Sequence, residues 1–145
     1  MKRAALIMLL LAGCASGSQD DENAPNIILH LTQDEAYSNA FTYAGSVNIR
    51  FVLSAANTTK DAVKLTRIEI RTIGTGAYTI RPTTTQINID LAPGEQKSVA
   101  LAVWGYARGG TLSSTEPVIL RGTAYLTGPS GAFMRLINEY ITPDR

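Results

Sequence analysis

The strongest constraint on the fold is an alternation of apolar and mostly polar residues with a period of two. It is clearest where Val47, Ile49, Phe51 and Leu53 are interleaved with Asn48-Arg50-Val52-Ser54. Successive side chains of a β-strand point to opposite faces, so a segment of this kind buries one face and exposes the other. The pattern predicts a strand that contributes to a core from one side only.

Similar short segments recur to the end of the chain and predict an all-β protein. Apolar residues alternate or cluster at residues 27–31, 63–70, 78–80, 87–91, 99–103, 118–126 and 132–141. The apolar phase slips between Leu65 and Ile68, which predicts a β-bulge near Thr66 or Arg67. Turn residues separate the segments, and Gly-Pro-Ser-Gly at 128–131 predicts a hairpin. About seven or eight antiparallel strands without a sustained helical period are typical of a β-sandwich.

The longest gap between predicted strands is residues 105–116, which are rich in Gly, Ser and Thr. Long connections of this composition lie at the surface and often carry binding residues. We therefore expect a functional or flexible loop over this range.

The N-terminus has the features of an export signal. A positive start at Lys2 and Arg3 is followed by an uninterrupted apolar run at residues 4–11. A membrane-spanning helix needs about 20 apolar residues, so the run is too short to span a bilayer. Its length and flanking residues are those of a secretory signal peptide.

The residues that end this segment, Leu11-Ala12-Gly13-Cys14, resemble the lipobox of bacterial lipoprotein precursors. The resemblance implies cleavage before Cys14, a diacylglycerol thioether on its sulfur, and acylation of the new amino group, typically with palmitate. Several acyl chains anchor a protein stably where one chain is marginal. Ala15, rather than Asp, follows the cysteine, which by the family rule implies the outer membrane of a two-membrane cell. The alternative is an incidental thiol in a plain signal peptide or N-terminal membrane anchor.

The chain is thus expected to have three parts: a signal peptide at 1–13, a lipidated N-terminus and flexible tether at 14–25, and a sandwich domain at 26–145. The stretch 16–23 has no apolar side chain to bury and cannot offset its ordering entropy. Its acidic residues Asp20, Asp21 and Glu22 fit a solvated spacer better than a calcium site.

Charge argues against a nucleic-acid partner. Loss of Lys2 and Arg3 from the 13 basic residues leaves 11 against 12 acidic ones, a formal charge of −1. The remaining basic residues are scattered along the sequence. A nucleic-acid binder would show a basic stripe or patch.

The sequence offers no catalytic, metal or cofactor site, and we predict that the protein is not an enzyme. Cys14 is the only cysteine and His30 the only histidine, so a zinc site cannot be assembled in the usual way. His30 is expected to point outward from its strand. There is no Gly-x-Ser-x-Gly elbow, and Gly109-Gly110 lacks the lysine of a phosphate loop. An enzyme would need two carboxylates facing each other across a cleft.

Four aromatic residues are the candidate binding residues. Tyr37 and Tyr43, with Phe41, lie between the first two predicted strands, and Trp104 and Tyr106 flank the long loop. Exposed rings there would stack on a sugar or anchor a protein partner, because Trp and Tyr are favoured at interface hot spots. The alternative is that these rings plug the ends of the sandwich.

The order of strands and turns carries a second resemblance. Asn57-Thr58-Thr59 follows an alternating strand, Pro93-Gly94-Glu95 precedes another, and residues 121–126 lead to Gly131-Ala132-Phe133. This order resembles the immunoglobulin-like β-sandwich of the LEA14/WHy type over about residues 27–141. The Asn-Pro pair of that type is absent, because Thr58 follows Asn57. The resemblance implies an immunoglobulin-like fold and a stress-related or accessory role.

These features together predict a membrane-anchored lipoprotein of the cell envelope, in the periplasm at the outer membrane. It would act as a non-enzymatic binding or accessory module that meets another envelope protein. The alternatives are a carbohydrate-binding module for peptidoglycan or a surface glycan, and a stress-protective LEA14/WHy-like domain.

Overall fold

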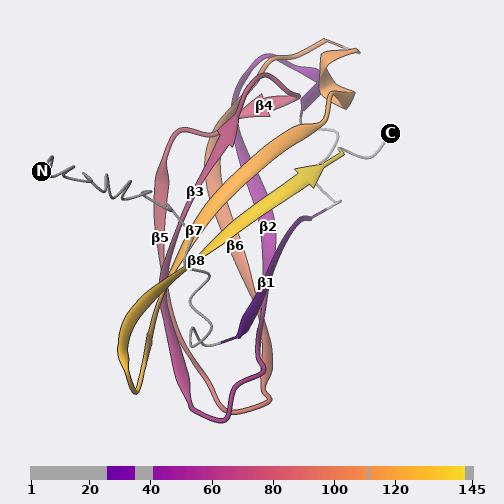
Figure 1. Cartoon of the computed structure of the whole chain (residues 1–145). Coiled ribbons are helices and arrows are strands. Elements are labelled where there is room, and N and C mark those ends of the chain that lie inside the picture. The colour runs from indigo at the N-terminus through magenta and orange to yellow at the C-terminus, as the bar shows by residue number, and fades with distance from the viewer. Residues whose placement is uncertain (1–25, 35–40, 111, 143–145) are drawn as a thin grey trace, which may run out of the picture.

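Eight strands form two layers in the computed structural model, which describes residues 26–34, 41–110 and 112–142 (Figure 1). The strands are β1 (Ile27–Gln33), β2 (Gly45–Asn57), β3 (Val63–Ile73), β4 (Tyr78–Thr79), β5 (Thr83–Leu91), β6 (Gln96–Ala107), β7 (Val118–Gly128) and β8 (Gly131–Ile141). The expected signal peptide at 1–13 and tether at 14–25, Cys14 included, lie outside the described residues.

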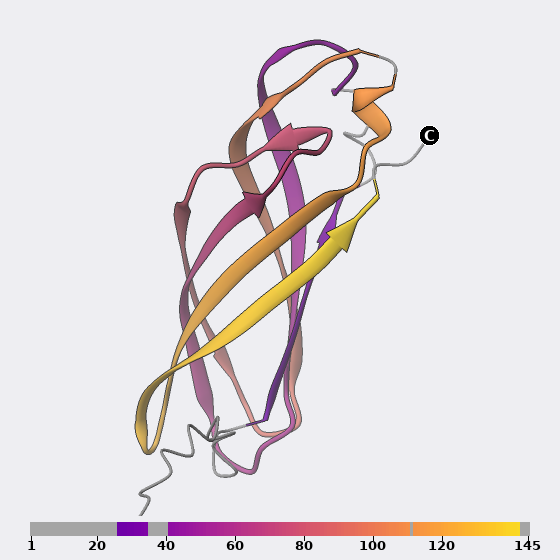
Figure 2. The same cartoon turned by 45° about the horizontal axis from the view of Figure 1, so that its top comes forward.

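The strand order confirms an immunoglobulin-like sandwich. Sheet A has the order β1-β2-β6-β4, sheet B has the order β5-β3-β7-β8, and every pairing is antiparallel. The first, second and sixth strands share one sheet, and the third, seventh and eighth share the other, as the corresponding strands of an immunoglobulin domain do. The two sheets pack face to face (Figure 2).

The predicted bulge and hairpin are both present. The register of β3 shifts between Leu65 and Arg67 against both of its neighbours, β5 and β7. At the bulge the hydroxyl of Thr66 donates to the carbonyl oxygen of Tyr125 at 2.9 Å. Gly128 pairs with Gly131 to close the β7–β8 hairpin.

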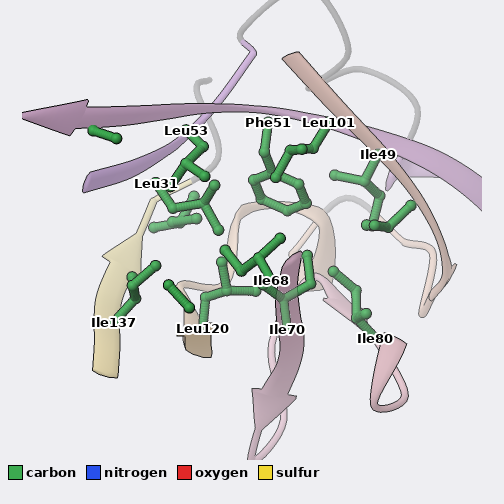
Figure 3. Packing of buried hydrophobic residues seen from close by; sticks show 14 of the residues in the cluster. Leu31, Ile49, Phe51, Leu53, Ile68, Ile70, Ile80, Leu101, Leu120 and Ile137 are labelled. Carbon is green, nitrogen blue, oxygen red and sulfur yellow. The ribbon is translucent and has the colours of Figure 1, made fainter. Parts of the chain in front are cut away.

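The core lies between the two sheets, and the predicted inward face of β2 contributes to it (Figure 3). Ile49, Phe51 and Leu53 of β2 face Ile68 and Ile70 of β3, and all five are 0–1% exposed. Full burial of a large apolar side chain contributes about 1.5–3 kcal/mol. The apolar positions of the alternation in β2 are therefore core residues.

One end of the sandwich is closed by Phe41 and Tyr78. Both side chains are fully buried, and their ring centroids are 4.8 Å apart. The Tyr78 hydroxyl donates to Oε1 of Gln33 at 2.8 Å. Burial raises the pKa of Tyr78 above its ordinary value. Phe41 thus has the plugging role that was the alternative for the aromatic residues.

Asn57, at the end of β2, holds the β2–β3 turn and the end of β5 together, and it is 1% exposed. Its Nδ2 donates to the carbonyl oxygens of Asp61 at 2.8 Å and Leu91 at 3.0 Å, and its Oδ1 accepts from the Thr59 amide at 3.0 Å. The side chain therefore links the β2–β3 turn to the end of β5. Every buried side-chain polar atom in the described part of the chain has a hydrogen-bond partner.

The predicted loop at 105–116 is wrong at its start, because β6 continues to Ala107. Gly105 lies inside this strand. A Cβ there would be 2.7 Å from Cδ1 of Ile49 and 2.8 Å from the carbonyl oxygen of Thr79. Close packing, rather than a turn, accounts for this glycine, and the connection to β7 begins at Arg108.

Candidate functional site

Trp104 and Tyr106 lie together on the outer face of sheet A. They are two residues apart in β6, so their side chains point the same way. Trp104 is 67% exposed and Tyr106 is 55% exposed. Neither ring closes an end of the sandwich, so the plugging alternative is wrong for this pair.

The two rings border a hollow of about 590 Å³, which is also lined by Ser46, Thr79, Arg81 and Gly105. The strand register explains this gathering. Tyr106 pairs with Ser46 of β2 on one side and with Thr79 of β4 on the other. Asn48 of β2 pairs with Trp104. Gly105 lets the strands approach beneath the rings, since any side chain would strike Ile49 or the Thr79 carbonyl.

The hollow combines aromatic rings, hydroxyl groups and one cation. The hydroxyls of Ser46 and Thr79 can donate and accept hydrogen bonds, and the Arg81 guanidinium supplies a fixed fork of donors. Arg81 has no ion-pair partner among the described residues. The arrangement suits binding of a ligand surface. Its described lining residues include no histidine and no carboxylate.

Sequence reasoning found the two rings but missed Ser46, Thr79 and Arg81. These residues come from β2, β4 and the segment after β4, and only the pairing of those strands with β6 brings them together. The short apolar segment at Tyr78–Ile80 is the sequence signal for them, because pairing this segment with β6 places Thr79 and Arg81 near the two rings.

The other two predicted binding residues do not line this hollow. Tyr43 is 81% exposed in the turn before β2. This turn is held to the β6–β7 connection by a hydrogen bond from the Gly110 amide to the Thr42 carbonyl oxygen at 2.9 Å. Tyr37 lies outside the described residues.

His30 is exposed at an edge of the sandwich, on the outward face that was predicted. Its Nδ1 lies 3.5 Å from Oε1 of Glu139, and the same oxygen accepts from the Leu31 amide at 3.2 Å. The carboxylate thus satisfies a backbone group where the edge strands β1 and β8 meet. The described residues contain no group of three or more His, Cys, Asp or Glu side chains that could hold a metal ion.

Two ionic contacts lie at connections between strands. The Glu95 carboxylate has a lowered pKa, first because the Ala92 amide donates to it and then because Lys97 is adjacent. Arg108 and Glu116 form an ion pair across the β6–β7 connection, with 2.6 Å between Nη1 and Oε2. These contacts hold turns in place.

Comparison with known proteins shows the fold and nothing further. No protein-family model and no curated protein matches the sequence. The solved structural genomics target SoR45 is 13% identical with a TM-score of 0.54, over 83% of this chain and 87% of that one. A β-glucuronidase from Bacteroides uniformis is 14% identical with a TM-score of 0.45, over 79% of this chain but 13% of its own.

The similarity to SoR45 supports the sandwich architecture. In the described part of this chain, no helix has both the length and the apolar character needed to cross a bilayer.

Proposed function

We propose that this protein is a lipid-anchored, non-enzymatic binding module of the cell envelope that recognises another envelope protein. Cys14 carries the anchor and the outer face of sheet A carries the binding site. The single observation that supports the site is the exposed pair Trp104 and Tyr106 around the hollow that Arg81 also lines.

The composition of this hollow favours a protein partner. Trp, Tyr and Arg are the three residue types most enriched among residues that dominate interface energies. The two rings are held on one strand, β6, so little backbone entropy is lost when a partner covers them. Ser46 and Thr79 add hydrogen-bonding groups at the rim.

The anchor is supported by the lipobox resemblance of residues 11–14. Labelling of cells with a palmitate analogue tests it, with Cys14→Ala as the control. We expect label on the native chain and none on the variant. Equal labelling of both would contradict lipidation at Cys14.

The binding site is tested by chemical crosslinking in cells, followed by capture of the full chain and identification of its partner. Trp104→Ala with Tyr106→Ala should reduce the crosslinked partner at least tenfold, because truncation of hot-spot residues costs about 2 kcal/mol or more. Leu112→Ala is the matched control, since Leu112 is 85% exposed but lies in the β6–β7 connection. Capture that is unchanged by the double variant would contradict this site.

A carbohydrate ligand is the second candidate, and one observation favours it. The two rings lie beside the hydroxyls of Ser46 and Thr79, and flat aromatic faces with adjacent polar groups can stack on and orient a sugar. Sedimentation with purified peptidoglycan separates the two proposals. A glycan ligand requires retention in the pellet that Trp104→Ala removes, whereas a protein ligand predicts no retention.

A further inference from the structure

The outer face of sheet B carries a different set of exposed side chains. Its apolar members are Ile119 of β7 and Met134, Leu136 and Tyr140 of β8, with exposed fractions from 44% to 77%. Alternate residues of β8 point the same way, and Tyr140 pairs directly with Ile119. Scattered single apolar residues are normal on a protein surface, but a contiguous group marks a surface that contacts something apolar.

Basic residues lie beside this apolar group. Arg71 of β3 pairs directly with Arg121 of β7, and both are exposed. Like charges placed opposite each other on a sheet are destabilising. Neither guanidinium has an ion-pair or hydrogen-bond partner among the described residues. An anionic ligand would relieve their repulsion.

The apolar and basic groups meet in one shallow hollow of about 380 Å³. It is lined by Glu69, Arg71, Arg121, Thr123, Leu136 and Asn138. Farther along the same face, the Arg67 guanidinium carbon lies 3.9 Å from the centroid of the Tyr125 ring. We call the set of Ile119, Met134, Leu136, Tyr140, Arg71 and Arg121 the basic–apolar face.

The charge on sheet B is predominantly positive. Lys64, Arg67, Arg71 and Arg121 point outward from β3 and β7, whereas Glu69 and Asp90 are the acidic side chains on the same face. A surface with aliphatic side chains at one edge and cations beside them is complementary to phosphate headgroups above acyl chains.

We propose that the basic–apolar face rests on an anionic phospholipid bilayer, with Arg71 and Arg121 on lipid phosphates and Leu136 and Met134 in the acyl boundary. This inference rests on the membrane anchoring proposed above. Arginine pairs with phosphate oxygens through two parallel hydrogen bonds. Because sheet A forms the opposite layer of the sandwich, docking by sheet B turns Trp104 and Tyr106 away from the membrane (Figure 2).

The position of Trp104, the only tryptophan, makes the orientation measurable. The native full chain is purified in detergent and reconstituted into vesicles whose acyl chains are brominated, with about one third of the lipid as phosphatidylglycerol. Bromine quenches indole fluorescence only near contact. We expect Trp104 to remain unquenched, and Leu136→Trp in a Trp104→Phe background to be strongly quenched.

The charge requirement is tested in the same Leu136→Trp, Trp104→Phe chain. Arg71→Gln with Arg121→Gln should shift the ratio of docked to undocked protein about 30-fold toward undocked, because each basic residue near an anionic surface contributes about fivefold. Arg50→Gln with Lys60→Gln removes the same charge elsewhere and should leave quenching unchanged. Replacement of phosphatidylglycerol by phosphatidylcholine should abolish quenching.

Flotation of the vesicles separates failure of this inference from failure of the anchor. Protein that floats with the vesicles without quenching at position 136 would overturn the docked orientation and leave the anchor intact. Protein that does not float would contradict both. A blue-shifted emission at position 136 that brominated lipid does not quench would place a second copy of the chain on this face, and would also overturn the proposal.

Discussion

The two outer faces of the sandwich differ although the inner faces are alike. Sheet A presents Trp104 and Tyr106 among hydroxyl groups, whereas sheet B presents Leu136 beside the opposed Arg71 and Arg121. Between them lies one core of aliphatic and aromatic side chains from both sheets. Burial fixes the inward residues of each strand and leaves the outward ones free. The outward residues are therefore where recognition can differ from face to face.

The largest effect should come from truncating an inner side chain of sheet A, in comparison with an outer one. Phe51→Ala empties a fully buried site and should lower the free energy of unfolding by about 3–5 kcal/mol. Trp104→Ala should change it by less than about 0.5 kcal/mol, because exposed side chains contribute little. Denaturant unfolding of both variants provides the comparison. A large loss in Trp104→Ala would show that this ring serves packing.

Gly105 lines the hollow on sheet A and Gly122 lines the hollow on sheet B, and these glycines should differ in their response to substitution. A Cβ at Gly105 would lie 2.7 and 2.8 Å from its nearest neighbours, whereas one at Gly122 would lie no closer than 3.3 Å. Gly105→Ala should therefore cost about 1–3 kcal/mol through overpacking, and Gly122→Ala clearly less. Thermal unfolding gives the order. Equal losses of stability in the two variants would mean that Gly105 is not more tightly packed than Gly122.

Tyr78→Phe should have a smaller effect that depends on pH. Loss of its hydrogen bond to Gln33 should cost about 1 kcal/mol at pH 7. The folded-state pKa of Tyr78 is raised, so its contribution to stability is present below the unfolded pKa of about 10 and is lost as pH rises above that value. The difference between native and variant should thus shrink at pH 11. Unfolding curves measured at pH 7 and 11 provide the test. An equal difference in the free energy of unfolding at the two pH values would contradict the burial of a neutral Tyr78 hydroxyl.

The smallest expected effect is a cross-effect between the faces. Leu136→Ser should leave partner capture through Trp104 and Tyr106 within about twofold of the native level, since distant sites with no shared contacts act additively. Partner crosslinking in cells measures it. A large loss of capture would show that one ligand spans both faces.

Most of the fold could be predicted from the sequence. A strand with one buried face has apolar residues at its inward positions and mostly polar residues between them, and this alternation is visible in the sequence. The bulge at Thr66 was visible as a slip in that alternation. The start of the β6–β7 connection was not, since Gly105 belongs to the Gly-, Ser- and Thr-rich run that predicts a loop, although it is needed for close packing.

The sites were harder to predict because they depend on which strands are neighbours. Trp104 and Tyr106 stand out by residue type, but Thr79 joins them only through the pairing of β4 with β6. The opposition of Arg71 and Arg121, fifty positions apart in the chain, depends in the same way on the β3–β7 register. Composition and periodicity do not encode such pairings.

Both proposed roles require the protein to be held at a membrane through Cys14. Intact mass spectrometry of the native protein, extracted from cells, tests this most directly. The account predicts a chain that begins at Cys14, with the added mass of a diacylglycerol thioether and an amide-linked acyl chain. An unmodified Cys14 in a water-soluble protein would contradict it.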